Sequence, residues 1–458
     1  MGGNSSLSGN SKKDDDGKAK RTGTLMTATA HIITGVIGSG VLSLAWTVAE
    51  LGWIAGPLCM LAFAVITWYT SILLADCYRH PHPVSGTRNY TYMDVVRNNL
   101  GGLQVKLCGI AQYGNLVGSN VGYTITASIS MMAITKVHCY QKNGENADCS
   151  ASLNPSMILF GVIQIILSQI PNFNKLSWLS MVAAIMSFTY SSISLGLSAA
   201  KLAGGGNIEK MLTGIPVGPD LSAMEKMWSI YSAVGNIAFA YSFSLILVEI
   251  QDTLKSGPPE NKVMKDATLI AISISTVFYI LCGVLGYAAF GNAAPGNLLT
   301  GFKGPIWLVD FANLCVAIHI VGAYQVYVQP LYGFVEDWSS KKWPDSKFIN
   351  GNGTSWFNPF RLVWRTAYVI LLTVIAMMFP FFNDIMGLLG AAGFWPLTVY
   401  FPIEMYLSQT QLKRSSFKWI WLQALSLICL IVSILSAAGS TYGIVKSLTT
   451  YKLFHAVS

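Results

Sequence analysis

The stretch that decides the fold is Thr24–Ala49, TLMTATAHIITGVIGSGVLSLAWTVA, the first long apolar segment of the chain. It places Gly35, Gly38 and Gly40 close together. Glycine inside a helix costs about 1 kcal/mol relative to alanine, so this cluster predicts a local break. A bilayer offers no water to the freed N–H and C=O groups, so such a break must face protein or a wet cavity. Interrupted spans of this kind are typical of secondary transporters. Close packing of two helices at small residues is the alternative interpretation.

The composition is that of an integral membrane protein. Of the 458 residues, 52% are hydrophobic and only 11% are charged, whereas soluble domains carry about 25% charged residues. A spanning helix needs about 20 mostly apolar residues. This criterion predicts eleven spans and leaves no room for a separate soluble domain. The predicted spans are 24–49, 53–78, 106–136, 155–170, 176–200, 227–252, 266–290, 304–332, 361–380, 384–408 and 418–443.

The net charge of +8 is a topology signal, and it implies no nucleic-acid partner. With the N-terminus inside, 21 of the 29 lysines and arginines fall on inner segments and 8 on outer ones. The positive-inside rule therefore predicts a cytosolic N-terminus and an extracellular C-terminus. We expect residues 1–23 to be a disordered cytosolic segment, 24–443 to be the eleven-span domain, and 444–458 to be an extracellular tail.

Two of the eight cysteines lie outside the predicted spans. Cys139 and Cys149 share one polar loop on the predicted outside, where an oxidising environment favours a disulfide. Two free thiols are the alternative.

The predicted spans also suggest an inverted repeat. Spans one to five and six to ten form two halves of opposite orientation, with span eleven appended, and span six then corresponds to span one. In span six, Gly235 and Asn236 precede the run Ala238–Ser242, without a proline. Taken alone, span six is predicted to be continuous, and only its correspondence to span one predicts an interruption.

If both spans are broken, the two breaks form a binding site. The half-helix that starts near Gly38 exposes unpaired N–H groups and a partial positive charge, which suit a carboxylate. Span six would offer carbonyl groups to an ammonium and aromatic walls to a side chain. Aromatic residues in spans are otherwise usually packing groups or interfacial anchors. The predicted substrate-binding residues are Gly35, Val36, Ile37, Gly38, Ser39, Gly40, Ala238, Phe239, Ala240, Tyr241, Ser242, Asn115, Tyr123 and Trp395.

Ionisable residues inside spans are costly, so they are candidates for proton coupling. His31 lies one turn before the glycine break, His319 lies in the middle of span eight, and Glu249 follows the suspected break in span six. His31 and Glu249 could pair as one titrating unit. A structural hydrogen bond is the alternative for each. No enzymatic motif or metal-ligand cluster rises above chance.

Four runs resemble the plant amino acid permeases, of the amino acid/auxin permease family within the APC superfamily. They are TATAHIITGVIGSGVLSLAW (27–46), QIPNFNKLSWLS (169–180), AFAYSFSLILVEIQDTLKSGPPEN (238–261) and HIVGAYQVYVQP (319–330). The resemblance extends from about residue 22 to the end. One departure is Gly35, where many relatives carry alanine; the extra glycine would loosen the break, alter selectivity, or let two helices pack closer.

The resemblance implies an all-α membrane protein with a LeuT-like 5+5 inverted repeat, discontinuous spans one and six, and an eleventh span. It implies a proton-coupled symporter that imports amino acids across a plant plasma membrane; the range of the family covers neutral and acidic amino acids, and some members take basic ones. The proton is the coupling ion, and no other cofactor, metal or enzymatic activity is expected. An auxin or other organic-anion carrier and a non-transporting amino-acid sensor are the alternatives. The sequence specifies no oligomeric state.

Overall fold

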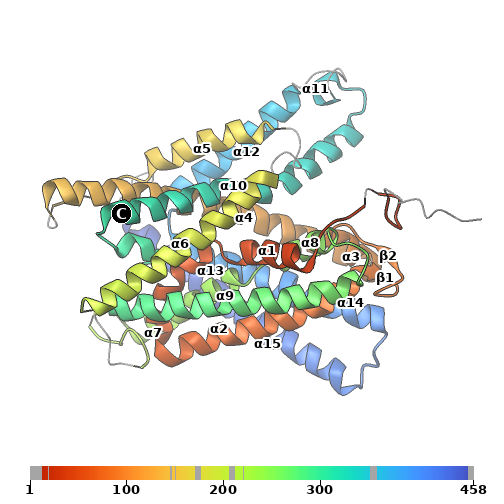
Figure 1. Cartoon of the computed structure of the whole chain (residues 1–458), viewed down its shortest axis with the longest axis horizontal. Helices are drawn as coiled ribbons and strands as arrows, with labels where there is room; N and C mark the ends of the chain where they lie inside the picture. Colours follow the sequence, from red (N-terminus) through yellow and green to blue (C-terminus); the bar gives the residue numbers. More distant parts are fainter. Residues whose placement is uncertain are drawn as a thin grey trace, which may run out of the picture.

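The computed structural model describes residues 13–18, 20–144, 147–149, 151–170, 177–205, 212–219, 221–350 and 358–451. It is almost entirely helical (Figure 1). The α-helices are α1 (Leu25–Val36), α2 (Leu44–Cys77), α3 (Tyr92–Asn99), α4 (Gly102–Asn143), α5 (Asn154–Ser168), α6 (Ser177–Ala203), α7 (Ala223–Ala240), α8 (Leu247–Gln251), α9 (Glu260–Phe290), α10 (Ile306–Lys342), α11 (Lys347–Asn350), α12 (Pro359–Met378), α13 (Phe382–Gly393), α14 (Phe401–Thr410) and α15 (Phe417–Thr450). The remaining elements are the short 3-10 helices η1 (Ser39–Ser43), η3 (Ser244–Ile246), η4 (Gly291–Ala293) and η5 (Leu298–Gly301), the π-helix η6 (Phe394–Tyr400), and the strands β1 (Arg79–His80) and β2 (Thr87–Arg88), which pair antiparallel.

Helices overlap all eleven predicted spans. Among the described residues, 8 helical stretches are long and apolar enough to cross a membrane, and α1 and α5 are shorter apolar helices. Helix α4 has 42 residues, but polar side chains such as Asn115, Ser119 and Asn120 are buried along it, so its hydropathy is low. The observed helices are therefore compatible with eleven spans, although the number that cross a bilayer stays a prediction.

Spans one and two meet at a bend in α2. Gly52 adopts φ 88° and ψ 176°, a conformation that favours glycine because it has no Cβ. The loop before α7 pairs with this bend. The N–H of Trp53 donates to the carbonyl of Leu212 at 3.1 Å, and the N–H of Ile215 donates to the carbonyl of Ala49 at 3.0 Å. The bend is therefore held by backbone hydrogen bonds from a distant segment.

The interrupted spans lie inside the bundle. Helix α1, drawn in red, occupies the middle of Figure 1 and packs against α6 and α9. Helices α2 and α9, which correspond in the two halves of the predicted repeat, pack along each other, and α7 packs against α13 and α15. On the other side, α10 packs against α4 and α6, and α5 packs against α12. The central helices therefore have neighbours that can supply hydrogen-bond donors to their broken segments.

The described part of the N-terminal segment differs from the predicted disorder. Arg21 donates to the Asp252 carboxylate at 2.8 Å and to Asp16 at 2.7 Å. Gly23 forms a bridge with Leu254, the residue just after α8 and its following turn. Arg21 and Gly23 thus hold this segment against the end of span six. Residues 1–12, which carry the rest of this expectation, lie outside the described residues.

Helix α15 continues to Thr450, beyond the predicted limit of span eleven, and residues 452–458 lie outside the described part.

Near the end of α4, the structure joins Cys139 and Cys149 in a disulfide with their Cα atoms 5.9 Å apart. The six other cysteines are free, and none of them is exposed.

Candidate functional site

Span one is broken at the glycine cluster. Helix α1 ends at Val36, and the chain becomes helical again at Ser39, where η1 begins and leads into α2. Ile37 and Gly38 lie between them in non-helical conformations. The predicted interruption of span one is therefore confirmed, and it exposes the carbonyl end of one half-helix and the N–H end of the next.

Span six is broken as well. Helix α7 ends at Ala240, the 3-10 helix η3 begins at Ser244, and α8 starts at Leu247. Tyr241, the residue at the break, has φ −99° and ψ 4°, outside the helical region. The interruption that only the repeat predicted is therefore present.

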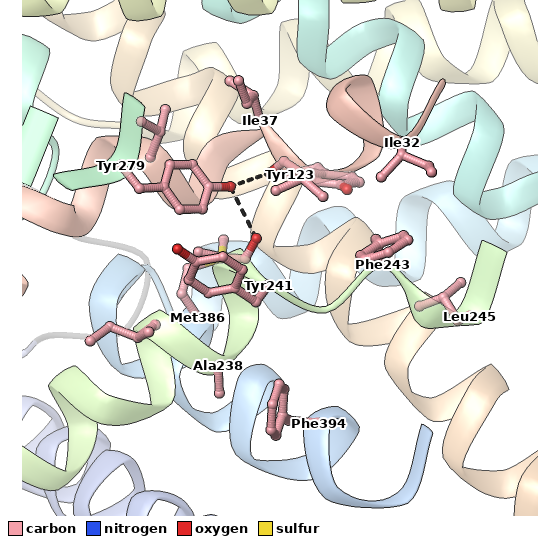
Figure 2. Packing of buried hydrophobic residues seen from close by; sticks show 14 of the residues in the cluster. Ile32, Ile37, Tyr123, Ala238, Tyr241, Phe243, Leu245, Tyr279, Met386 and Phe394 are labelled. Atoms are coloured by element: carbon pink, nitrogen blue, oxygen red, sulfur yellow. Dashed lines mark hydrogen bonds between the residues drawn. The ribbon is translucent and has the colours of Figure 1, made fainter. Parts of the chain in front are cut away.

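Two buried tyrosines supply donors to the carbonyl groups that the breaks release. The hydroxyl of Tyr190, on α6, donates to the carbonyl of Gly38 at 2.9 Å. The hydroxyl of Tyr279, on α9, contacts the carbonyl oxygens of both Val36 and Ala240, the latter at 3.0 Å (Figure 2). Inside a bilayer these carbonyl groups have no water to bind, so the tyrosines stabilise both breaks.

A pocket lies between the two breaks. None of its lining residues is charged or is a histidine, and both α4 and α10 contribute hydroxyl groups to its wall. The lining residues are Gly35, Val36, Gly38, Ser39, Gly40, Asn115, Ser119, Tyr123, Phe239, Ala240, Ser242 and Tyr327. Among the described residues, no group of three or more His, Cys, Asp or Glu side chains is placed to hold a metal ion.

The helix ends give this neutral pocket an internal polarity. Val36 and Ala240 end α1 and α7, and a helix C-terminus carries a partial negative charge. Ser39 and Gly40 begin η1, whose first N–H groups have no partner inside the helix. The Oγ atom of Ser39 is buried and has no hydrogen-bond partner in the described part of the chain. The pocket therefore offers acceptors beside donors, without a net counter-charge.

Most of the predicted substrate-binding residues surround this pocket, and four do not. Ile37 and Ala238 are buried in the apolar core. Tyr241 points away from the pocket and donates to Thr276 at 3.0 Å. Trp395 donates through Nε1 to Ser426 on α15 at 3.2 Å. It lies in the π-helical stretch η6, whose different periodicity changes which side chains face the pocket.

Two lining residues were missed by the sequence reasoning. Ser119 lies midway between Asn115 and Tyr123 on α4, so the four-residue spacing of one helix face would have identified it. Tyr327 lies eight residues after His319 on α10, and its ring packs edge-to-face against Tyr123 with centroids 5.3 Å apart. Its place in the site depends on this contact between distant helices, which the sequence does not reveal.

His319 lies directly behind the break in span one. It is 2% exposed, and its Nδ1 lies 2.8 Å from the carbonyl of Ala183 on α6. Its ring packs edge-to-face against Tyr190, the donor to Gly38, with centroids 5.7 Å apart. A Cβ added to Gly38 would lie 3.8 Å from His319 Nε2. His319 is therefore positioned to respond to the conformation of the break.

The suggested pair of His31 and Glu249 does not form in this structure. His31 is exposed, because the buried face of α1 is formed by residues such as Ala28 and Ile32. Glu249 accepts instead from the backbone N–H of Tyr92, at 3.3 Å, at the start of α3. Its other oxygen, Oε2, is buried and has no partner in the described residues. Glu249 therefore has one fully buried carboxylate oxygen, and no cation is paired with it in the part of the chain that the structure describes.

Comparisons with known proteins agree with this architecture. Residues 21–446 match the family model "Transmembrane amino acid transporter protein". The chain is 60% identical to amino acid permease 6 of Arabidopsis thaliana, covering 98% of this chain and 95% of the relative, and 59% identical to amino acid permease 8 of the same plant over 96% and 95%. The solved structure of MhsT in complex with L-phenylalanine matches 92% of this chain and all of its own with a TM-score of 0.59 at 12% identity, which confirms the LeuT-like fold. The matched relatives are transporters rather than enzymes. The protein therefore belongs to the transmembrane amino acid transporter family and is related to the plant amino acid permeases.

Proposed function

We propose that this protein imports amino acids together with protons across the plasma membrane, by alternating access at the pocket between the two breaks. The observation that carries the proposal is the uncharged pocket lined by backbone from both interrupted spans. A zwitterion needs acceptors for its ammonium and donors for its carboxylate, but no net counter-charge. The names of the related permeases of Arabidopsis thaliana support amino acids as the substrate class.

In this proposal each end of the zwitterion binds one polarity of the pocket. The ammonium donates to carbonyl oxygens at the ends of α1 and α7, where the helix dipoles are negative. The carboxylate accepts from the first N–H groups of η1 and from the free hydroxyl of Ser39. The side chain extends toward Asn115, Ser119 and Tyr327. This neutral wall favours neutral amino acids, and an acidic one would enter with its side chain protonated.

The proposed proton carriers are Glu249 and His319, with His31 on the exposed face of α1 as a third candidate. One buried oxygen of Glu249 has no partner within the described residues, so protonation would remove a buried charge that no cation described there balances. His319 packs against the tyrosine that holds the carbonyl of Gly38. A proton on either group would therefore change the polarity around a break.

The two alternatives make different demands on this pocket. An auxin or another organic anion has a carboxylate but no ammonium, so it would leave the carbonyl ends of α1 and α7 without donors. It would also find no lysine, arginine or histidine among the lining residues. A non-transporting sensor would bind an amino acid in the same way, and uptake is what separates it from a carrier.

The test is electrophysiology and radiolabelled uptake in oocytes that express the protein. A panel of the L-amino acids and indole acetate is applied at external pH from about 5 to 8, with water-injected oocytes as the background. We expect inward currents with amino acids that grow as the pH falls. Currents independent of pH would remove proton coupling, preference for indole acetate would favour the anion carrier, and binding without uptake would favour the sensor. Epitope tags at the two termini, probed in intact cells, test the proposed cytosolic N-terminus and extracellular C-terminus.

A further inference from the structure

The hydroxyl of Tyr279 is shared between the two broken spans. It contacts the carbonyl oxygen of Val36 at the end of α1 and that of Ala240, 3.0 Å away, at the end of α7 (Figure 2). Tyr279 itself lies on α9, is fully buried, and does not line the pocket. It therefore reaches the two carbonyl groups from behind, while Val36 and Ala240 face the pocket.

A phenol has a single O–H hydrogen, so it cannot satisfy two carbonyl groups at once. The carbonyl of Val36 also accepts from the N–H of Gly38 at 2.8 Å. Among the described residues, the carbonyl of Ala240 has no donor besides Tyr279. With the hydrogen directed at Val36, the carbonyl of Ala240 is left open toward the pocket.

The two carbonyl groups would not stay close without a donor between them. Both end a helix, and both helix ends carry partial negative charge, so they repel each other. No charged side chain lines the pocket to balance them. The position of Tyr279 is fixed by packing, since its ring lies edge-to-face against Tyr241 with centroids 5.3 Å apart.

We propose that Tyr279 is a positioning residue, which holds the ends of α1 and α7 together by one shared hydrogen and leaves the carbonyl of Ala240 as the acceptor for the substrate ammonium. This inference rests on the proposed function, because it requires an amino-acid substrate in this pocket. Tyr279 does not touch the substrate in this arrangement. It sets the distance between the two acceptors and ties the movement of the broken part of span one to that of span six.

The test is the change Tyr279→Phe, which removes the hydroxyl and keeps the ring. The matched control is Tyr324→Phe on α10, because the hydroxyl of Tyr324 is buried and has no partner in the described residues. Both variants are compared with wild type for radiolabelled uptake of the L-amino acid that the wild type transports fastest, normalised to the amount at the cell surface. Loss of this bridge should raise KM by roughly tenfold while the maximum rate changes less than about twofold. Tyr324→Phe should leave KM within about twofold of wild type.

A purely structural role would lower the surface amount and leave KM unchanged, and that result would overturn the proposal. If Tyr279→Phe transports nothing, amino-acid binding is measured instead from the thermal stability of the purified protein. The amino-acid concentration that gives half of the maximal stabilisation should then rise by roughly tenfold. If the variant does not fold, 3,5-difluorotyrosine is introduced at position 279; its more acidic hydroxyl should change KM by at least about twofold, and an unchanged KM refutes the idea. If the wild type takes up no amino acid, both the proposed function and this inference are refuted. If the wild type takes up amino acids but Tyr279→Phe and Tyr324→Phe have the same KM, only this inference is refuted.

Discussion

The change Gly40→Ala tests whether the two breaks must lie in contact. A Cβ on Gly40 would lie 3.0 Å from both the Cα and the Cβ of Ala240, which ends α7 and forms the part of the pocket's wall that belongs to span six. Non-bonded carbon atoms prefer about 3.5–4.0 Å, so the breaks would separate by roughly 0.5 Å or more. Because Ala240 presents main chain here, no side chain can move aside. Gly40 has no positive φ, so alanine can adopt its backbone conformation and the effect is one of space.

Overpacking of this kind costs about 1–3 kcal/mol. If the cost falls on the arrangement that binds the substrate, affinity falls by roughly 5- to 150-fold, since each 1.4 kcal/mol is tenfold. The matched control is Gly35→Ala. The atom nearest to its Cβ would be Cδ1 of Ile246, at 2.8 Å, which is the flexible end of a side chain, and the next contacts would be ordinary ones at 3.9 Å or more. We expect Gly35→Ala to change KM by no more than about threefold.

The assay is amino-acid uptake in oocytes, with surface labelling to normalise the rates and heat denaturation of the purified proteins to compare stability. Alanine is also the better helix former by about 1 kcal/mol, so it would favour η1 if space were available. An affinity for Gly40→Ala equal to that of wild type, or higher, would refute the argument that contact between the breaks builds the site. Equal losses for both variants would refute the distinction between main chain and side chain.

Three further changes test individual groups. Glu249→Gln should weaken the pH dependence of transport more than it weakens amino-acid affinity. The control is Glu404→Gln, which alters a carboxylate that accepts a hydrogen bond from α15 and should transport like wild type. A normal pH profile in Glu249→Gln would show that Glu249 is not the proton carrier. Ser39→Ala should raise KM by about 2- to 10-fold without lowering thermal stability, because the hydroxyl has no partner in the described residues; a loss of stability with unchanged KM would contradict a role in binding. The hydrogen bond from Arg21 holds the pKa of Asp16 well below its usual range, so this contact stabilises the N-terminal segment above a pH of about 4 and is lost as the pH falls further. Asp16→Asn should therefore speed tryptic cleavage after Arg21 at neutral pH, and an unchanged rate would show that the segment is held by other contacts.

The break in span one could be predicted from its sequence, whereas the break in span six could not be predicted locally. The glycine cluster marks the first directly. In span six, the break falls at Tyr241, with neither glycine nor proline at that position. Its stabilising donor is Tyr279, thirty-nine residues away from Ala240 in the chain. A helix end that is held by a hydroxyl from a distant part of the chain leaves no local signal, so only the repeat predicted this break.

The position of His31 could have been predicted from periodicity. Ala28, Ile32 and Val36 recur every four residues and form the buried face of α1. His31 lies off this stripe and is exposed, so a pair with a buried carboxylate conflicts with the helix's own pattern. The prediction relied on distance along the chain from the break, and distance along a helix does not determine which face a residue occupies.

The structure also changes the explanation for the glycine cluster itself. None of Gly35, Gly38 and Gly40 has a positive φ, so the backbone of the break does not require glycine for its conformation. What two of them provide is space toward span six: Gly35 faces Ile246 of η3, and Gly40 faces Ala240 at the end of α7. Gly35 lines the pocket with main-chain atoms, and its missing Cβ would point at Ile246, so it serves the packing of the two breaks more than the width of the pocket. Span one is interrupted here because tyrosines on other spans donate hydrogen bonds to its carbonyl groups. The glycines let the ends of α1 and α7 approach closely enough for both to contact the hydroxyl of Tyr279.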